Sequence, residues 1–220
     1  MIRNLKILFV AAMALGAFGV FNAAGAQAAE FHCSVEPCRY TLTRDGTEET
    51  AHHVFVLKNA KKETISFTCE SLSGEGTSAL KTAATLTVTN PAYTNCESVL
   101  GKATVEMNGC EYKFTSSGTV TIVCPGTNKI DIKASATCTV QVGPQGPLNG
   151  ITYHNLNKGS GKGSVTVSAK VAGIASTVTG SCGTFDITST PITSEYTTGN
   201  TIVTAEKDNA NKETVEGWWE

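Results

Sequence analysis

The sequence predicts an all-β fold, either an antiparallel β-sandwich or a barrel-like domain stapled by disulfides, preceded by a helical signal peptide. Short segments of alternating apolar and polar residues recur along the chain, and clusters of Gly, Pro, Asn and Ser separate them. Threonine accounts for 32 of the 220 residues, and β-branched side chains favour a pleated, half-buried surface. The eight cysteines are an even number, which predicts a disulfide framework in an exported protein.

Residues 1–28 have the pattern of an export signal. Arg3 and Lys6 supply the positive start, residues 7–21 form an apolar run, and Ala26-Gln27-Ala28 is a small-x-small cleavage site. A membrane anchor is the alternative, but a spanning helix needs about 18 apolar residues, which is more than this run provides. We therefore expect a mature chain that begins at Ala29, is secreted or associated with the cell envelope, and has no membrane span after cleavage.

The mature chain divides by composition into two parts. Residues 29–205 carry the strand pattern and form the disulfide-stapled all-β region, as one large domain or two packed β subdomains. Residues 206–220 are charged and Asn-rich and are expected to be a mobile tail, although Trp218 and Trp219 could instead dock on the body.

The charge balance disfavours nucleic acid as a partner. Without Arg3 and Lys6 the chain has 15 basic and 19 acidic residues, and the basic residues are scattered, with only Lys61 and Lys62 adjacent. A nucleic-acid-binding surface concentrates Lys and Arg on one face.

The strands are expected where apolar and polar residues alternate, or where a short apolar run lies between turn signals. They are residues 39–43, 54–57, 64–69, 85–89, 103–107, 129–133, 138–142, 151–155, 165–171, 185–188 and 201–205. Glycines predict a loop at 71–78, a turn is expected between 93 and 101, and residues 157–163 form an exposed, glycine-rich hairpin tip.

The segment 110–124 predicts a hairpin together with its register. Folding it about Ser117 places the even-numbered, core-like residues opposite one another, and Gly118 stands where a three-residue loop needs a left-handed residue. Directly opposed residues of an antiparallel pair are about 4.5 to 5.5 Å apart at Cα, which suits a disulfide. The opposed pairs are then Cys110 with Cys124, Tyr112 with Ile122, and Phe114 with Val120.

All eight cysteines are predicted to form disulfides, although eight thiols allow 105 pairings. Hairpin register supports Cys110 with Cys124 directly, and connectivity beyond this pair stays open. Cys33 and Cys38 close a short loop, Cys69 and Cys96 end an excursion that contains the strand 85–89, and Cys138 with Cys182 is partly the remaining pair, although both share parity with inward valines. A zinc site at Cys33 and Cys38 beside His32 is the competing interpretation, but the remaining spacings contain no Cys-x-x-Cys motif. The predicted pairs are Cys33 with Cys38, Cys69 with Cys96, Cys110 with Cys124, and Cys138 with Cys182.

Several motifs, spread over about residues 64–205, resemble those of a family of uncharacterised secreted, cysteine-containing β-rich proteins of environmental bacteria. The resemblance implies an all-β fold and an extracytoplasmic location, and it implies no activity. The motifs are Phe-Thr-Cys-Glu at 67–70, Thr-Val-Thr-Asn-Pro-Ala-Tyr-Thr-Asn-Cys at 87–96, Met-Asn-Gly-Cys-Glu-Tyr-Lys-Phe at 107–114, Val-Cys-Pro at 123–125, Cys-Thr-Val-Gln-Val at 138–142 and Gly-Ile-Thr-Tyr-His-Asn at 150–155.

Local motifs for chemistry are weak, so no catalytic, cofactor-binding or metal-binding residue is predicted. The sequence contains no nucleophile elbow, and residues 159–163 resemble a phosphate loop only in their glycines. Adjacent His52 and His53 would point to opposite faces of a strand, and His154 falls on the outward parity. The aspartates Asp45, Asp131, Asp186 and Asp208 are scattered, and the acidic residues that cluster, Glu48 with Glu49 and Glu70 with Glu75, fall in expected turns or loops, so nothing local indicates a glycosidase pair.

Two hypotheses follow from different classes. The first is a secreted, non-catalytic β module that binds a protein or a cell-surface polymer through its loops, or serves a structural role in the envelope. The second is an extracellular hydrolase, or an enzyme inhibitor, whose site is assembled from residues distant in sequence. A pocket with convergent polar side chains would favour the second hypothesis.

Overall fold

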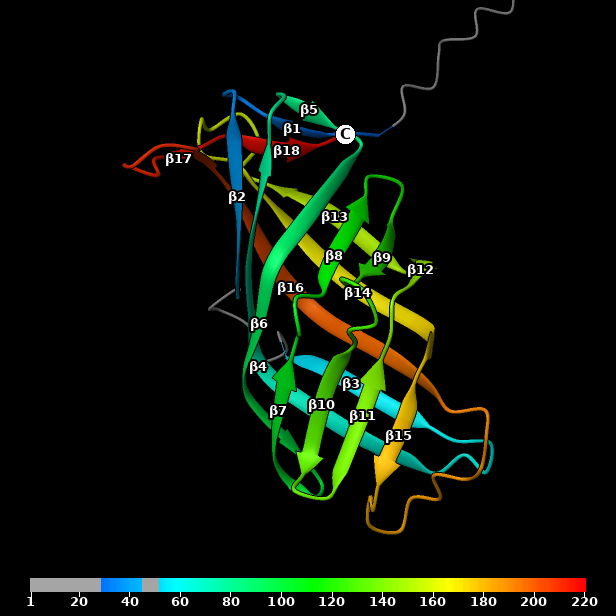
Figure 1. Ribbon diagram of the computed structural model, residues 1–220. Helices are drawn as coiled ribbons and strands as arrows, with labels where there is room; N and C mark the ends of the chain where they lie inside the picture. Colours follow the sequence, from blue (N-terminus) through cyan, green and yellow to red (C-terminus); the bar gives the residue numbers. More distant parts are fainter. Residues whose placement is uncertain (1–28, 45–51) are drawn as a thin grey trace, which may run out of the picture.

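The computed structural model describes residues 29–44 and 52–220, and every regular element within them is a β-strand (Figure 1). The predicted signal peptide, Asp45 and the acidic pair Glu48-Glu49 lie outside the described residues. The strands are β1 (Phe31–Cys33), β2 (Cys38–Arg44), β3 (His53–Lys58), β4 (Thr64–Ser78), β5 (Thr82–Ala83), β6 (Thr85–Ser98), β7 (Gly101–Glu106), β8 (Glu111–Thr115), β9 (Thr119–Val123), β10 (Ile130–Ser135), β11 (Cys138–Val142), β12 (Gln145–Asn149), β13 (Ile151–Leu156), β14 (Ser164–Ala175), β15 (Thr177–Gly180), β16 (Thr193–Lys207), β17 (Thr214–Val215) and β18 (Gly217–Trp219).

Fifteen of these strands form one antiparallel sheet, so the predicted all-β fold is confirmed. Four long strands, β4, β6, β14 and β16, run through it, and shorter strands lie between them. β2 and β3 both lie between β16 and β4, one above the other in the orientation of Figure 1. β2 pairs with the upper parts of β16 and β4, and β3 pairs with the lower parts of the same two strands. The long strands therefore connect an upper and a lower half of the sheet.

The upper half closes on itself through residues 145–156. β12 pairs with β9, and after Gly150 the chain continues as β13, which pairs with β14. The amide of Lys170 donates to the carbonyl of Gly150, with a distance of 2.7 Å between nitrogen and oxygen. The Gln145 side chain makes two hydrogen bonds to the backbone of Ala175, of 3.0 and 2.8 Å, which extend the pairing. Residues 145–156 therefore form one bent segment that pairs with β9 through its first part and with β14 through its second part.

The lower half closes in a similar way through β14 and β15. Only Ser176 separates these two strands, yet β14 pairs with β16 while β15 pairs with β11 on the opposite side. Starting from β14, neighbouring strands pair in the order β16, β3, β4, β6, β7, β10, β11 and β15. Because β15 follows β14 almost directly in the chain, the sheet closes on the segment formed by β14 and β15. The architecture is barrel-like, which is one of the two forms expected for alternating strands of this number.

A second sheet of three strands, in the order β18-β1-β5, lies across the upper end (Figure 1). Phe31 of β1 is opposite Trp219 on one side and Ala83 on the other. Phe31 is also buried, with its ring edge-on to Tyr153 at 5.0 Å between centroids. We call this three-stranded sheet the cap.

The β8–β9 hairpin has the register that the sequence predicted. Tyr112 is opposite Ile122 and Phe114 is opposite Val120, and the Cys110–Cys124 disulfide lies at the open end. Gly118 has a φ of 86°, in the left-handed region that the turn requires. The local alternation of side chains was sufficient to determine this element.

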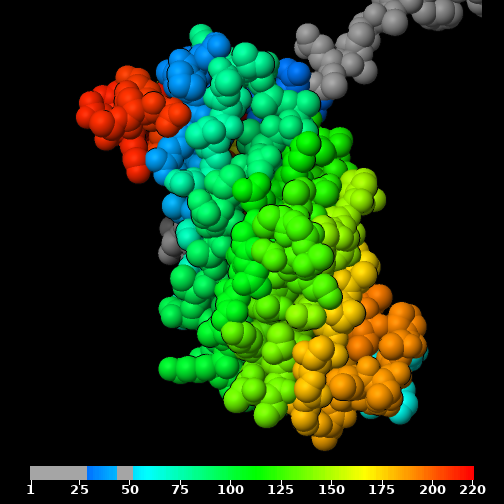
Figure 2. All heavy atoms as spheres, viewed as in Figure 1, coloured from blue at the N-terminus to red at the C-terminus, as the bar shows by residue number. Residues whose placement is uncertain are grey.

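The C-terminal residues differ from the expected mobile tail. The chain after Lys207 turns and forms β17 against β16 and then β18 against β1, so that Val215 and Gly217 are buried. In Figure 2 the red C-terminal residues project beside blue residues from the start of the described chain. The structure therefore has the alternative arrangement, in which the terminal tryptophans dock on the body.

The predicted strand at 185–188 is wrong, since these residues lie in the irregular segment between β15 and β16. Conversely, two predicted irregular segments are strands. Residues 71–78 belong to β4, and residues 93–98 belong to β6. Glycines interrupt the apolar pattern here because β4 and β6 approach closely: a Cβ on Gly76 would lie 2.3 Å from the carbonyl oxygen of Thr87, and one on Gly74 would lie 2.6 Å from Val88. Gly74 and Gly76 thus fit a close strand contact and do not mark a loop.

Candidate functional site: an apolar interior cavity

The barrel contains an apolar cavity of about 140 Å³. Strands of both halves line it with their inward faces, and Phe31 and Trp218 of the cap line its upper end. Lower in the barrel the lining includes Phe55 and Phe67, whose rings are 6.0 Å apart. The cavity is thus formed by the alternation of side chains that predicted the strands, since most inward residues contribute hydrocarbon or aromatic surface.

A buried group of tyrosines and one histidine forms the main polar part of the lining. His53 Nδ1 and the Tyr196 hydroxyl are hydrogen-bonded across β3 and β16, and His53 packs edge-on against Tyr93 at 5.7 Å between ring centroids. The Tyr93 and Tyr112 hydroxyls are hydrogen-bonded to each other at 3.0 Å. Burial raises the pKa of Tyr93, Tyr112 and Tyr196, so all three phenols stay neutral near pH 7. The side chains of this group therefore form hydrogen bonds with one another, and the hydroxyls of the three tyrosines are uncharged.

Tyr40 is a further aromatic residue of the lining. Its side chain shares a face of β2 with Cys38 and Leu42, which are also buried, and only 5% of the residue is exposed. The Tyr40 hydroxyl is buried and makes no hydrogen bond to any described residue. Burial raises the pKa of this phenol to about 12. Thr198, another residue of the lining, likewise has a buried hydroxyl with no hydrogen-bond partner among the described residues.

The cap is fastened to the barrel by hydrogen bonds around Trp219. The Asn155 side chain accepts from the Trp219 amide and donates to its carbonyl, both at 2.7 Å, and therefore acts like a neighbouring strand. The Trp219 indole nitrogen donates to the carbonyl of Ser116, in the β8–β9 turn, at 3.1 Å. The cap thus closes the upper end through contacts to β13 and to the hairpin.

The glycine-rich tip at 157–163 is exposed over residues 157–162, as predicted. It nevertheless contacts the C-terminal segment: Lys158 forms an ion pair with Glu220 and lies 5.8 Å from the centroid of the Trp218 ring. The amide of Gly159 donates to Glu216. Trp218 also stacks on His32, with ring centroids 5.0 Å apart. The tip therefore adds a polar fastening to the outer side of the cap.

The other candidates from the sequence do not converge on the cavity. His154 is exposed, and His53 lines the cavity whereas His52 does not, as opposite parity predicts. Asp186 forms an ion pair with Lys61, and that contact lowers the pKa of its carboxyl, together with hydrogen bonds from Thr188. In the described part of the chain, no three His, Cys, Asp or Glu side chains are grouped so that they could bind a metal ion.

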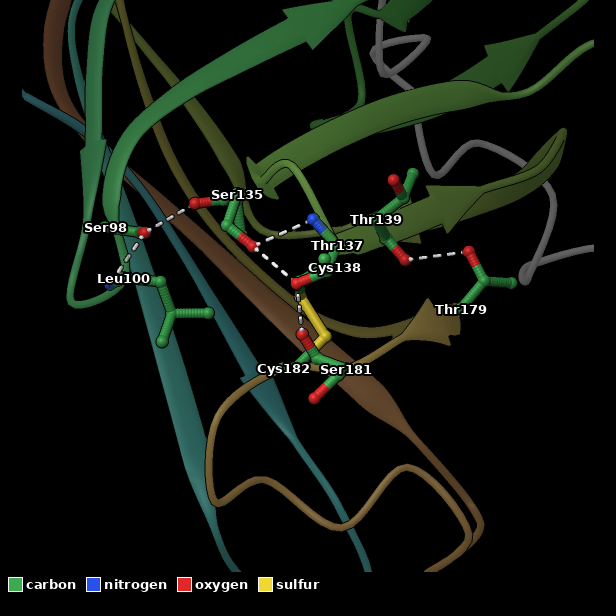
Figure 3. The surroundings of a disulfide bond; sticks show 10 residues. Ser98, Leu100, Ser135, Thr137, Cys138, Thr139, Thr179, Ser181 and Cys182 are labelled. Carbon is green, nitrogen blue, oxygen red and sulfur yellow. Dashed lines mark hydrogen bonds between the residues drawn. A yellow bond between two sulfur atoms is a disulfide. The ribbon is translucent and has the colours of Figure 1, made fainter.

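All eight cysteines form disulfides, in the four pairs expected from the sequence. Cys33–Cys38 ties the cap to β2, and Cys138–Cys182 fixes the segment after β15 to the start of β11. Figure 3 shows the latter beside the hydrogen bond from the Thr137 hydroxyl to the carbonyl of Ser181, at 3.2 Å. The Ser181 amide donates in turn to the carbonyl of Thr137 at 2.7 Å. This disulfide thus fastens the lower closure of the barrel.

Sequence reasoning did not single out Tyr40, Tyr196 or His53 as members of one site. A usable signal existed for Tyr40, because it alternates with Cys38 and Leu42 and so shares their inward parity. His53 and Tyr196 are 143 residues apart and meet only because β3 pairs with β16. Their meeting depends on strand order, which a local pattern does not encode.

Comparison of the chain with protein-family models, with curated proteins and with solved structures finds no match.

Within residues 29–44 and 52–220 there is no helix long and apolar enough to span a bilayer.

Proposed function

We propose that this protein is an exported, non-catalytic binding module that encloses a small apolar molecule inside its barrel. The observation that carries the proposal is the cavity of about 140 Å³ among apolar side chains. The four disulfides support an extracytoplasmic location, because such bonds persist in oxidising compartments. The proposal moves the binding surface from the loops, where the sequence suggested it, to the interior.

The character of the lining supports an apolar ligand. An engineered protein cavity of about 150 Å³ lined by Leu, Ile and Phe stays dry and binds benzene or xenon, so a cavity of similar size is adequate for one small ring. Transfer of apolar surface out of water contributes about 25 cal/mol per Å². A ligand whose surface is mostly hydrocarbon therefore gains most from this interior.

Exposed surface gives less support to a docking face. The large hydrophobic side chains that are well exposed in the described residues are Leu80, Val99 and Val123, which come from three different segments. Scattered single apolar residues are normal for a protein surface. The concave apolar surface of the interior is the stronger candidate for binding.

Toluene binding to the disulfide-bonded protein tests the proposal. Saturation-transfer NMR should detect toluene on the wild-type protein, and an excess of ethylbenzene should displace it. Ala169→Phe should abolish the signal, because Ala169 is buried and lines the cavity. Ala172→Phe is the matched control, since Ala172 lies on the same strand and is exposed.

The proposal fails if folded wild-type protein gives no toluene signal, or if both variants bind toluene as the wild type does. Circular dichroism of each variant establishes that loss of binding does not reflect loss of folding.

A further inference from the structure

We infer that the bound molecule is aromatic, and that a continuous set of aromatic side chains in the cavity lining selects it over a saturated hydrocarbon of similar size. This inference rests on the proposed function and specifies its ligand class. We call the set the aromatic arc. Its members are Phe55 of β3, Tyr93 of β6, Tyr112 and Phe114 of β8, and Tyr196 of β16, all of which line the cavity.

Contacts between neighbouring side chains make the arc continuous from β3 to β6. Tyr196 is directly opposite Phe55 where β16 pairs with β3, and opposed residues of an antiparallel pair are in contact on one face of the sheet. The ring of His53 lies 6.1 Å from that of Tyr196 and 5.7 Å from that of Tyr93, between centroids. Three strands thus contribute aromatic surface to one region of the interior.

The arc continues onto the β8–β9 hairpin. The Tyr93 and Tyr112 hydroxyls are hydrogen-bonded at 3.0 Å, and the rings of Tyr112 and Phe114 meet edge to face with 6.3 Å between centroids. Because the rings hold one another in place, a ligand that enters does not have to order them. Such preorganisation increases affinity.

The rings of the arc keep surface that a small molecule can reach. Burial raises the pKa of Tyr93, Tyr112 and Tyr196, so these side chains lie deep in the protein. All members of the arc pack against the core, yet each is only half-buried, whereas Phe67 in the same lining is 2% exposed. Surface that stays accessible on inward side chains of the lining faces the interior space.

An aromatic ligand matches this surface better than a saturated one. An aromatic ring has a negative face and a positive edge, so two rings prefer edge-to-face or offset contacts with centroids about 4.5 to 7 Å apart. Such pairs gain more than the burial of their apolar area provides. Cyclohexane buries hydrocarbon surface but lacks this charge pattern, so it gains only the burial.

Benzene and cyclohexane, which have the same number of carbon atoms, test the inference. Their dissociation constants are to be measured by NMR titration on the wild type, on Phe55→Leu and on Phe114→Leu. These substitutions replace a ring at either end of the arc by a branched hydrocarbon side chain. Phe185→Leu is the matched control, because Phe185 is buried but does not line the cavity. Comparing the ratio of the two constants between proteins cancels the different hydration of the two ligands.

We expect Phe55→Leu, Phe114→Leu or both to shift the ratio about threefold to tenfold against benzene, since a ring–ring contact is lost. Phe185→Leu should leave the ratio as in the wild type. Bound benzene should also show nuclear Overhauser effects to ring protons of the arc in the wild type, a measurement that does not depend on the folding of any variant.

The role of the arc is wrong if both ligands bind and neither arc variant shifts the ratio, or if Phe185→Leu shifts it equally. It is also wrong if bound benzene shows no Overhauser effect to the arc, or if the folded wild type binds cyclohexane and not benzene. In each of these cases the cavity remains a binding site. If neither hydrocarbon nor toluene binds the folded wild type, the proposed function itself is wrong.

Discussion

Neighbouring residues of the β8–β9 hairpin occupy opposite environments. Tyr112 points into the barrel and its hydroxyl bonds to Tyr93, whereas Lys113, the next residue, is exposed. Tyr112→Ala should lower the free energy of unfolding by about 3 to 5 kcal/mol, since it removes a buried ring and leaves a cavity. Lys113→Ala should change it by less than about 0.5 kcal/mol. Denaturant unfolding of the two variants measures both, and equal effects would contradict the register.

Which side chains of the hairpin point inward was predictable, because the inward and outward directions alternate between adjacent residues of a strand. The sequence correctly placed Tyr112, Phe114 and Val120 inside and Lys113 outside, and it assigned Gly118 to the turn. It could not indicate that the Tyr40 hydroxyl is buried without a hydrogen-bond partner among the described residues. The unpaired state of that hydroxyl is a property of its three-dimensional surroundings, which include β16 and β4.

At the scale of elements, close packing of β4 and β6 makes a specific demand on Gly76. A Cβ at this position would meet the carbonyl oxygen of Thr87 at 2.3 Å. Gly76→Ala should therefore destabilise the protein by about 1 to 3 kcal/mol, as overpacking typically does. Gly143→Ala is the control, because the nearest atom to its Cβ would be 4.0 Å away on Lys129. Thermal unfolding distinguishes the two variants. An equally small loss of stability in both would mean that β4 and β6 can move apart at no cost.

The cap strand β18 depends on one side chain of β13. Asn155 makes two hydrogen bonds to the backbone of Trp219, and each contributes about 0.5 to 1.5 kcal/mol. Asn155→Ala should increase amide hydrogen exchange in residues 217–220 while leaving the hairpin protected. His154→Ala alters the adjacent exposed residue and should have no such effect. Unchanged exchange in Asn155→Ala would show that β1 alone secures β18.

Long strands were the elements that sequence reasoning divided wrongly. Gly74 and Gly76 suggested a loop, and Asn90 with Pro91 suggested a strand end, yet β4 and β6 continue through these residues. Gly and Pro usually interrupt strands because of their own conformational preferences. Here the register shift between Ser73 and Glu75 accommodates the irregular residues within a paired strand. Such accommodation involves the partner strand and is absent from the local pattern.

At the scale of the whole molecule, all five tyrosines face the interior or its edges, and burial raises the pKa of each. Near pH 11 the phenols of an unfolded chain, with pKa values of about 10, are ionised, whereas those of the folded chain are not. The folded state then binds more protons, so its stability falls as the pH rises above about 10. Phenolate absorbance at 295 nm should remain low until the protein unfolds and should then increase for all five together. Stepwise ionisation of the folded protein would show that some rings are exposed.

The fold class, the disulfide pairs and the hairpin followed from the sequence, but the barrel closure and the cap did not. Each closure depends on a bent segment, 145–156 above and β14 with β15 below, whose two parts pair with different neighbours. The alternation of apolar and polar residues predicts that a segment is a strand, but it does not predict which strand will pair with it. The interior cavity forms only when these strands are paired in this order.

The pairing of β1 with β18 also constrains the order of assembly. Phe31 and Trp219 are opposite each other, although almost the whole described chain lies between them. Contacts between residues distant in sequence form late, because the entropy of closing the intervening chain is lost before the contact contributes. Local hairpins such as β8–β9 can form early, and the cap can form only after the C-terminal residues have emerged. During that interval the upper end of the barrel is open, which gives a ligand access to the interior before β18 closes over it.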